Sequence, residues 1–265
     1  MELKKNLHTF VISAWKESPF IEDTVKSLLN QSYHSKIMIA TSSPNDFLKN
    51  LCLKYGIDYR INLDVELAES AVNWSYAYAQ ADTKYVTLAH QDDLYLPDYT
   101  LQMVELAEKQ PNAVMEFCRC FNYTNGKRLK YHPLLLMKDI LLLPYFLKHA
   151  IYSKKLRFYY LGLGNPICCP SVMFNKELIG DFEFDSEVKV NLDWEAWLRL
   201  AQYDGAFLFS KKRLLLRRIH DDSGTTLTYN NGSRRKDDLT FFCKFWPKPV
   251  ASLLARLYNL AEFLN

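Results

Sequence analysis

The sequence predicts an α/β fold with a mostly parallel β-sheet that is flanked by helices. Its first hundred residues alternate short apolar runs that favour strands with segments whose apolar residues recur at helical spacing. The resulting order, β-α-β-α-β-α-β, is typical of a parallel sheet with helices on both faces. The chain has 265 residues, of which 49% are hydrophobic and 24% are charged. This composition fits one large domain, or one domain with an appendage.

The first three strands and helices follow one another closely. Strands are expected at residues 8–14, 36–40 and 58–62 because these runs are short and apolar. Helices are expected at 21–30, 47–55 and 66–81, where apolar residues recur every three or four positions. Either Asn45 or Asp46 is placed to cap the second helix, and Gly56 is placed to end it.

The fourth strand starts at Tyr85 and ends in the polar run His90-Gln91-Asp92-Asp93. In a parallel sheet this run shares one edge with the strand exits at 14–17 and 41–45, and open α/β sheets bind ligands at that edge. Two adjacent carboxylates are costly there unless a cation or a donor offsets them. Oxygen ligands favour Mg²⁺ or Mn²⁺. The alternative is a solvated turn in which Asp93 caps a helix.

The second half of the chain continues the alternation less regularly. Asn125-Gly126 predicts a hairpin turn, and residues 165–174 predict a loop that enters a strand. The remaining expected elements are a helix at 100–109, a strand at 113–120, a helix at 192–200, strands at 206–210 and 213–219, and a tail helix after Pro247 and Pro249.

Residues 130–163 interleave leucine runs and aromatic residues with lysines and one arginine. An amphipathic basic segment of this kind suits contact with a membrane surface or with a lipid-linked acceptor. The alternative is a pair of core helices with solvated lysines. No apolar run approaches the roughly 20 residues of a membrane span.

Charge and cysteine usage exclude several classes of protein. The net charge of +3 argues against a dedicated nucleic-acid binder, which normally carries a strongly basic surface. The six cysteines include no CxxC pair, so a zinc site is not expected. They are expected to be reduced, buried and cytosolic. The first five residues are too short and too charged for a signal peptide.

Several short motifs then occur in a fixed order between His8 and Thr226. They are the first strand with its polar turn, Ser27-Leu28-Leu29-Asn30-Gln31-Ser32-Tyr33, Asn73-Trp74, His90-Gln91-Asp92, Asp193-Trp194-Glu195-Ala196-Trp197-Leu198-Arg199 and Arg218-Ile219-His220-Asp221-Asp222-Ser223-Gly224-Thr225. Together they resemble a family 2 glycosyltransferase of the inverting GT-A type. The resemblance implies a GT-A (Rossmann-like) domain over residues 1–228 with a helical insertion at 130–163, and a C-terminal helical tail at 229–265.

The resemblance also implies roles for particular residues. Asp193 matches the general base that activates the acceptor hydroxyl, although it could instead cap its helix. Asp92 and His220 match the site of a Mn²⁺ or Mg²⁺ ion that stabilises the leaving diphosphate. Asp93 is expected to support its loop by hydrogen bonding. The nucleotide-sugar candidates are Ala14, Glu17, Thr41, Ser42, Asn73, His90, Gln91, Asp92 and Arg218. The acceptor-side candidates are Cys169, Trp194 and Glu195, with core packing as the alternative for Cys169 and Trp194.

Three positions depart from the family pattern. His90 stands where the family usually has the first aspartate of its metal motif. Thr41-Ser42-Ser43 replaces the usual acidic pair after the second strand, so the contact to the nucleotide base is unassigned and UDP, dTDP and GDP sugars all stay open. Leu192 replaces the first acid of the acceptor-side motif.

The leading hypothesis is a cytoplasmic enzyme, in contact with the inner face of the membrane, that transfers a sugar from a nucleotide-diphosphate sugar to a glycan or lipid-linked saccharide. Its product would belong to a surface polysaccharide or lipopolysaccharide. The alternative is a non-catalytic GT-A-like protein that binds nucleotide sugar or glycan, or that scaffolds a synthesis complex. A nucleotidyltransferase ranks lower, because no glycine-rich phosphate loop follows the first strand. A metal-dependent hydrolase would need more histidine or carboxylate ligands.

Overall fold

The computed structural model describes residues 6–63, 70–129, 132–224, 226, 228 and 232–263. Of the expected features, residues 66–69, the first two residues of the insertion (130–131), Thr225, and positions 229–231 and 264–265 lie outside this part. The strands are β1 (His8–Ala14), β2 (Lys36–Thr41), β3 (Asp58–Ile61), β4 (Tyr85–His90), β5 (Leu94–Tyr95), β6 (Ala113–Thr124), β7 (Lys127–Leu129), β8 (Ala150–Ile151), β9 (Met173–Asn175) and β10 (Ala206–Arg218). The helices are α1 (Ile21–Leu29), α2 (Asp46–Tyr55), α3 (Ser70–Gln80), α4 (Tyr99–Lys109), α5 (Pro133–Leu141), α6 (Leu143–Leu147), α7 (Lys154–Leu161), the 3₁₀ turn η1 (Cys169–Ser171), α8 (Lys176–Ile179), α9 (Leu192–Leu200), α11 (Ser233–Cys243) and α12 (Lys248–Phe263).

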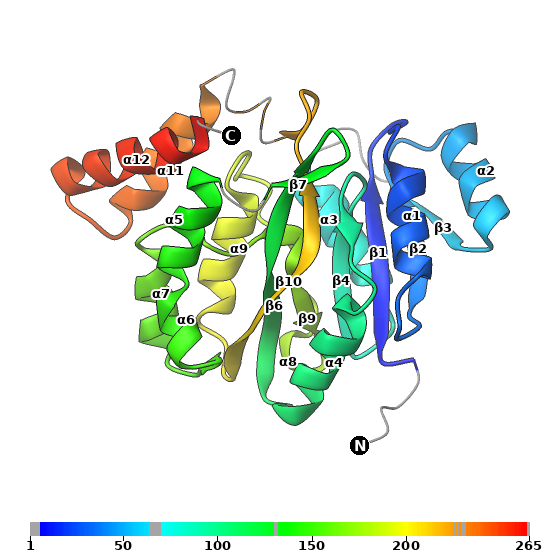
Figure 1. Ribbon diagram of the computed structural model, residues 1–265, viewed down its shortest axis with the longest axis horizontal. Coiled ribbons are helices and arrows are strands. Elements are labelled where there is room, and N and C mark those ends of the chain that lie inside the picture. The colour runs from blue at the N-terminus through cyan, green and yellow to red at the C-terminus, as the bar shows by residue number, and fades with distance from the viewer. Residues whose placement is uncertain are drawn as a thin grey trace.

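The strands form one mixed sheet in the order β3-β2-β1-β4-β9-β6-β10-β5, with β7 and β8 attached to β6 and β10 (Figure 1). β3, β2, β1 and β4 are parallel neighbours, and β6 is parallel to β10. The short strand β9 is antiparallel to both β4 and β6, so it joins the two parallel halves. The predicted mostly parallel sheet is therefore confirmed.

The register of β1 brings the predicted strand exits together. Ala14 pairs with Thr41 of β2, and Ser13 pairs with His90 of β4. The three strands thus end at one level, as the alternating pattern predicts. The exits form the upper edge of the sheet in Figure 1, and the N-terminus lies at the opposite end.

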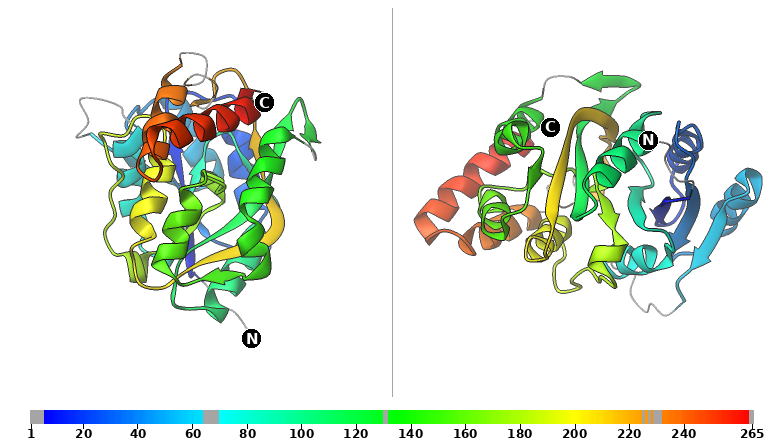
Figure 2. Two further views of the ribbon diagram at one scale, coloured as in Figure 1. Left: turned by 90° about the vertical axis from the view of Figure 1, so that its left-hand side faces the viewer. Right: turned by 90° about the horizontal axis from the view of Figure 1, so that it is seen from below.

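Side chains that alternate along the strands build a core on each face of the sheet. In β1, Phe10 and Ile12 join the cluster that α1, α2 and α4 cover, whereas Val11 joins the cluster on the other face with α3 and α9. This alternation follows from the two-residue repeat of a strand, and apolar residues on both sides are typical of parallel sheets covered by helices. Figure 2 shows helices on both sides of the sheet.

Local signals fix several boundaries as the sequence predicts. The Asn45 side chain accepts a hydrogen bond from Leu48 N–H and caps α2, and Gly56 ends α2 in the left-handed conformation. Asn125 and Gly126 both have positive φ, at 48° and 75°. That combination forms the predicted hairpin turn between β6 and β7.

Three expectations change. Residues 206–218 form one strand, because both halves stay paired to β6 across a register shift between Ser210 and Arg213. The insertion adds helices α5, α6 and α7 with the short strand β8, where a helix pair was the alternative. The tail holds a helix before Pro247 as well as the predicted one. This helix, α11, is stabilised by Phe241 and Phe242, which contact the buried Trp194 ring.

The insertion and the tail pack on one another beside the main sheet, at the left of Figure 1. The division of the chain at residue 228 stays a prediction. All six cysteines are free thiols, but Cys169 is only half-buried and Cys243 is exposed, which corrects the expectation that all are buried. Among the described helices, none is long and apolar enough to cross a membrane.

Candidate active site

The exits of β1, β4 and β10 surround a cavity of about 450 Å³. Its wall also includes residues of α3, α5, α9 and the η1 turn. A cavity of this size at the carboxyl edge of a parallel sheet is the usual place and volume of a small-molecule site. The structure brings seven of the sequence candidates together in its wall, namely His90, Gln91, Asp92, Cys169, Asp193, Arg218 and His220.

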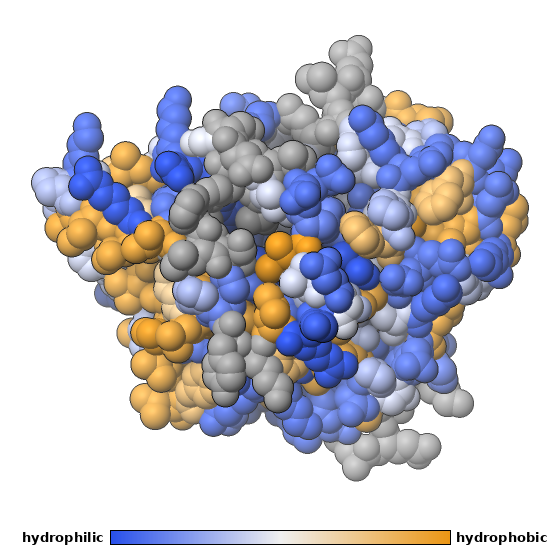
Figure 3. Space-filling view, turned by 45° about the horizontal axis from the view of Figure 1, so that its top comes forward, coloured by the Kyte–Doolittle hydropathy of each residue, from blue (hydrophilic) through white to orange (hydrophobic). Residues whose placement is uncertain are grey.

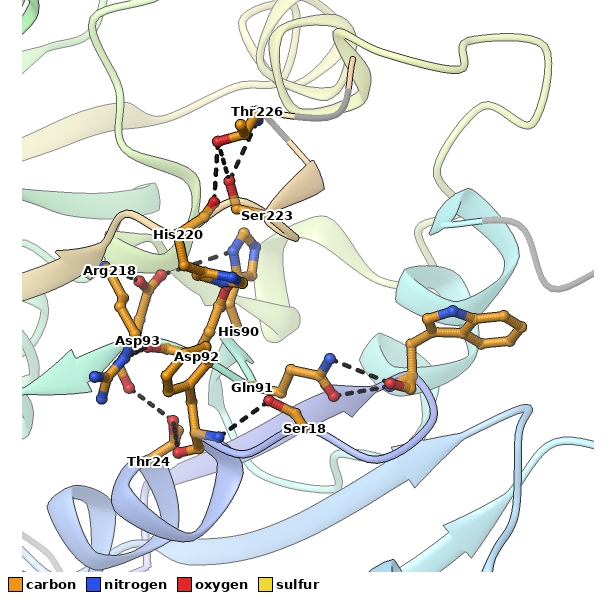
Figure 4. A network of polar contacts seen from close by, with 12 residues as sticks. Ser18, Thr24, His90, Gln91, Asp92, Asp93, Arg218, His220, Ser223 and Thr226 are labelled. Carbon is orange, nitrogen blue, oxygen red and sulfur yellow. Dashed lines mark hydrogen bonds and ion pairs between the residues drawn. The ribbon is translucent and has the colours of Figure 1, made fainter. Parts of the chain in front are cut away.

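The Gln91 side chain links the end of β4 to the end of β1 through two hydrogen bonds (Figure 4). Its side-chain oxygen accepts from Trp15 N–H at 2.9 Å, and its side-chain amide donates to the Trp15 carbonyl oxygen at 3.2 Å. These two hydrogen bonds to the Trp15 backbone take the place of the pair that one further residue of β4 would form with β1. Gln91 positions the loop on which Asp92 lies.

Asp92 and His220 meet across the cavity although they are 128 residues apart. His220 Nε2 lies 2.8 Å from Asp92 Oδ2, and the Phe20 ring packs on the imidazole with the ring centroids 4.7 Å apart. The His220 Nδ1 atom is buried and has no hydrogen-bond partner among the described residues. The structure thus brings the two residues predicted as metal ligands into contact at the strand ends.

Asp93 stabilises the loop that carries Asp92 through two hydrogen bonds. Its Oδ1 accepts from Arg218 N–H at 2.8 Å, and its carbonyl oxygen accepts from the Thr24 hydroxyl at 2.9 Å. Burial raises the pKa of Asp93 well above its usual value, and the charge of Asp92 raises it further. Arg218 Nε donates to the Asp92 carbonyl at 2.8 Å, so Arg218 holds this loop as well as lining the cavity.

His90 lies beside the Asp92 and Asp93 carboxylates, and the Trp74 ring packs against its imidazole. The Trp74 ring centroid is 5.3 Å away, and Nδ1 is 3.8 Å from Asp93 Oδ2. Burial lowers the pKa of His90, and the charges of Asp92 and Asp193 offset part of that change. Ligand atoms of His90, Asp92 and Asp93 all lie within 4.8 Å of one another. The described residues thus offer carboxylate and imidazole donors, which suit Mn²⁺ or Mg²⁺.

Asp193 is aimed into the cavity by two hydrogen bonds. Asn165 Nδ2 donates to Asp193 Oδ2 at 2.8 Å, and Trp194 N–H donates to Asp193 Oδ1 at 2.8 Å. Asn165 is 4% exposed, and its own Oδ1 accepts from Ile167 N–H at 3.2 Å. Asp193 is the second residue of α9, whose N-cap is Asn191, so it faces the cavity without holding the capping position of the alternative interpretation.

Cys169 also lines the cavity, as the sequence predicts for the acceptor side. Burial raises the pKa of the Cys169 thiol well above its usual value, and the negative charges of Asp193 and Asp93 raise it further. The thiol is therefore neutral and is not a nucleophile at neutral pH.

Two acceptor-side candidates lie outside the cavity. Trp194 is fully buried, donates from its indole nitrogen to the Leu161 carbonyl at 3.0 Å and stacks on Phe241. Its position corresponds to the core alternative. Glu195, one position further along α9, is 8% exposed and holds Arg199 through both carboxylate oxygens, at 2.7 and 2.9 Å. The helix turns both side chains away from Asp193.

Five nucleotide-binding candidates also do not line the cavity. For Ala14, Glu17 and Asn73, an immediate neighbour lines it instead. Ser13, Trp15 and Ser18 line it beside Ala14 and Glu17, and Trp74 lines it beside Asn73. Thr41 is buried and its hydroxyl accepts from Ser43 N–H at 3.0 Å, while the Ser42 hydroxyl is buried without a partner among the described residues. The sequence thus predicted the correct strands and helices at these positions, but not which side chain of each faces the cavity.

Other cavity residues were not expected from the sequence, among them Asn165, Lys138 and Arg217. Arg217 precedes Arg218 of the last motif, so its place next to that motif is a signal that could have found it. Neither Asn165 nor Lys138 belongs to a motif that predicts a catalytic site, and only the packing of the chain brings Asn165 to Asp193 and Lys138 to the cavity wall.

Comparison with known proteins agrees with this geometry. The model of glycosyl transferase family 2 matches residues 9–181. The chain belongs to this family. It is therefore an enzyme, a nucleotide-sugar-dependent glycosyltransferase, and the resemblance inferred from the motifs is confirmed.

Individual relatives are more distant. The chain is 28% identical over 202 residues to TuaG of Bacillus subtilis (strain 168), a protein assigned as a teichuronic acid biosynthesis glycosyltransferase, and the match covers 74% of this chain and 72% of TuaG. S. aureus TarS 1–349 has a TM-score of 0.61 at 10% identity, covering 97% of this chain and 71% of that one. The Pyrobaculum calidifontis mannosyltransferase PcManGT has a TM-score of 0.64 at 13% identity, covering 97% and 70%. These structures confirm the GT-A fold of the family 2 enzyme.

Proposed function

We propose that this glycosyltransferase joins a sugar from a nucleotide-diphosphate donor to a hydroxyl of a glycan or lipid-linked saccharide, with inversion at the anomeric carbon. One observation carries the proposal: Asp193, aimed by Asn165, and the Asp92–His220 pair face the same cavity. A general base and a site for the leaving group are the two parts that a direct displacement needs.

Asp193 acts as the base in this proposal. As the acceptor oxygen bonds to the anomeric carbon, its proton passes to an Asp193 carboxylate oxygen. The bond between that carbon and the diphosphate oxygen breaks at the same time, and the nucleoside diphosphate leaves with the electron pair. The new bond forms on the face opposite the leaving group, so the configuration inverts.

Asp92 and His220 would hold a Mn²⁺ or Mg²⁺ ion. The residues fit such an ion, because a carboxylate and an imidazole converge at the cavity and His90 and Asp93 stand next to them. When bound, the ion offsets the charge that develops on the leaving diphosphate. The protein's own part is to hold both ligands in place, through the Arg218 contact to the Asp92 carbonyl and the Phe20 contact to His220.

The nucleotide would bind where Gln91 joins the exits of β1 and β4. The Ala14–Glu17 turn carries Trp15 into this region, and Thr41, Ser42 and Asn73 stand behind it as supports. No acidic residue occurs at positions 41–43, so the nucleotide base is an experimental question. Structures of TarS with UDP-GlcNAc and of PcManGT with GDP-Man show different bases on this fold. A thermal-shift panel of UDP, dTDP, GDP, CDP and ADP, with and without Mn²⁺, would select the donor.

We place the product in cell-surface polysaccharide synthesis, including lipopolysaccharide as one such glycan. TuaG, to which this chain is similar, carries an assignment to teichuronic acid biosynthesis. We place the enzyme in the cytoplasm, where its six free cysteines would stay reduced.

We also propose that the enzyme contacts the inner face of the membrane. Exposed apolar side chains gather on the insertion and the tail, at the left of Figure 3, with hydrophilic side chains above them. On α12 these are Val250, Leu253, Leu257 and Leu260, and on α5 and the start and end of α6 they are Leu136, Ile140, Leu143 and Leu147. Lys248 and Arg256 lie on the same helix as the first group. An apolar stripe with cations beside it suits an anionic bilayer surface.

The catalytic proposal is tested by measuring nucleoside diphosphate release with an acceptor present. Asp193→Asn should retain Mn²⁺-dependent nucleotide binding and lose turnover by about 10²–10⁴-fold, the usual contribution of a general base. Asp204→Asn, which removes an exposed carboxylate far from the cavity, is the control and should turn over normally. Equal turnover in the two variants would show that Asp193 is not the base.

The membrane proposal is tested separately by co-sedimentation with anionic vesicles at low salt. Leu257→Asp should reduce binding, whereas Leu53→Asp should not, because Leu53 is exposed on α2 on the other side of the molecule. The wild-type protein remaining in the supernatant would overturn this part of the proposal.

A further inference from the structure

Two cations that line the cavity have no ion-pair partner among the described residues. Lys138 of α5 and Arg217 of β10 are both half-buried, and the side chain of neither makes a hydrogen bond or an ion pair with any described residue. The carboxylate nearest to Lys138 in sequence, Asp139, is already held by Arg119 at 2.6 Å and Arg213 at 2.7 Å. Lys138 and Arg217 therefore differ from the neighbouring arginines, which all have acidic partners.

The two cations act on the same small region. Both are close enough to act electrostatically on the Cys120 and Cys168 thiols, and Lys138 also acts on Cys169. Cys168 and Cys169 precede and begin the η1 turn that forms one wall of the cavity. Lys138 and Arg217 thus converge on this wall, next to the side from which Asp193 faces the cavity. Two like charges held together in a half-buried place are unfavourable until an anion joins them.

Their location differs from that of Arg218. β10 directs successive side chains to opposite sides. Arg218 reaches the Asp92 carbonyl and Asp23 of α1, whereas Arg217 acts on the Cys120 and Cys168 thiols and also on His90 and Asp93. In Figure 1, α5 lies across β10 from β1 and β2, whose exits form the nucleotide end. Lys138 therefore stands on the acceptor side, and Arg217 stands between it and the Asp92–His220 site.

We propose that Lys138 and Arg217 form a subsite for an oxyanion of the acceptor, a carboxylate or a phosphate on the saccharide that receives the sugar. This inference rests on the proposed function, since it takes Asp193 to mark the acceptor side. The planar guanidinium of Arg217 can bind an oxyanion through two parallel N–H groups, and the Lys138 ammonium adds a point charge. The enzyme would then select acidic acceptors, such as a uronic acid or a phosphorylated saccharide, over neutral ones.

The test uses small probes that carry only the acidic feature. Ligand-observed NMR measures binding of methyl glucuronide and glycerol 3-phosphate, with methyl glucoside and glycerol as neutral counterparts. The protein is first saturated with Mn²⁺ and the nucleoside diphosphate that stabilises it most. At least one acidic probe should bind to the loaded enzyme about tenfold more tightly than its neutral counterpart, and the better probe identifies carboxylate or phosphate as the preferred group.

Variants tie the binding to the two cations. Lys138→Met and Arg217→Met should each weaken the acidic probe about tenfold, with nucleotide binding and melting temperature unchanged. Lys148→Met, which removes an exposed charge from the same insertion, is the control and should bind the probe normally.

The proposal is overturned if nucleoside diphosphate displaces the acidic probes, or if the two variants lose nucleotide binding instead, because the cations would then serve the donor diphosphate. Equal binding of acidic and neutral probes, or no probe binding at all, would also overturn it. A failure of the proposed function looks different: Asp193→Asn would turn over normally while the acidic probes still bound.

Discussion

Asn165 offers the sharpest test of how the structure prepares Asp193. Its side chain donates to the Asp193 carboxylate at 2.8 Å and accepts from Ile167 N–H at 3.2 Å, and it is 4% exposed. Asn165→Ala removes both bonds. A hydrogen bond to a charged group contributes about 1.5–3 kcal/mol, and a neutral one about 1 kcal/mol. The variant should therefore lose about 2–4 kcal/mol of unfolding free energy, part of it because Ile167 N–H becomes buried without a partner.

The same change should lower turnover beyond its effect on stability. Asp193 would keep only the bond from Trp194 N–H, so its second oxygen would be free to rotate away from the acceptor hydroxyl. Loss of this alignment should reduce kcat about 10–100-fold, equivalent to about 1.4–2.7 kcal/mol, with little change in the KM for the donor.

Asn175→Ala is the matched control. Asn175 is as buried, and its side chain donates to the Ala113 carbonyl at 2.9 Å, but it lies on β9 and does not line the cavity. Urea unfolding and nucleoside diphosphate release would be measured for both variants below their melting temperatures. Similar stability losses with a kcat decrease only in Asn165→Ala support the positioning role. A kcat that falls equally in both, or in neither, refutes it.

Three further results are expected. His8 is fully buried, and burial lowers its pKa to about 3. Below pH 6.5 the unfolded chain takes up a proton at His8 that the folded chain does not. The free energy of unfolding should therefore fall by about 2 kcal/mol from pH 6.5 to 5. In urea titrations at the two pH values, the unfolding free energy of His8→Gln should decrease by about 2 kcal/mol less than that of the wild type. An equal decrease in the two proteins would contradict the assignment. Gly205→Ala should cost more than about 2 kcal/mol, since φ is +116° and the new Cβ would meet the Asn112 carbonyl oxygen; a normal melting temperature would argue against it. His220→Ala should abolish the Mn²⁺-dependent part of nucleotide-induced thermal stabilisation, whereas His149→Ala, outside the cavity, should not; retained Mn²⁺ dependence would remove His220 from the metal site.

The sequence alone determined the elements whose signals are local. The apolar runs that became β1, β2 and β4, the Asn45 cap and the Asn125-Gly126 turn each depend on residues within one short segment. The edge where Asp92 lies also followed, because parallel strands end at a common edge. The ordered motifs added the family, and with it the expectation that Asp92, Asp193 and His220 share a site.

Tertiary structure decided which side chain of each motif faces the cavity. Trp194 stands next to Asp193, yet the turn of α9 buries it against Phe241 of the tail. Trp74, and not its neighbour Asn73, stacks on His90 for the same reason. A shift of one residue reverses a strand side chain and rotates a helical one by 100°, so a motif gives the region and packing gives the facing atom.

Only the folded chain could bring Asn165 to Asp193, or Lys138 to Arg217. Asn165 and Asp193 are 28 residues apart, and Lys138 belongs to an insertion whose helices are placed by α12 and β10. Such contacts leave no pattern within a segment, because their free energy depends on how distant elements pack and on which charges remain unpaired. The sequence by itself thus determined the class of chemistry, and the tertiary structure decided how Asp193 is aimed and which charges line the cavity.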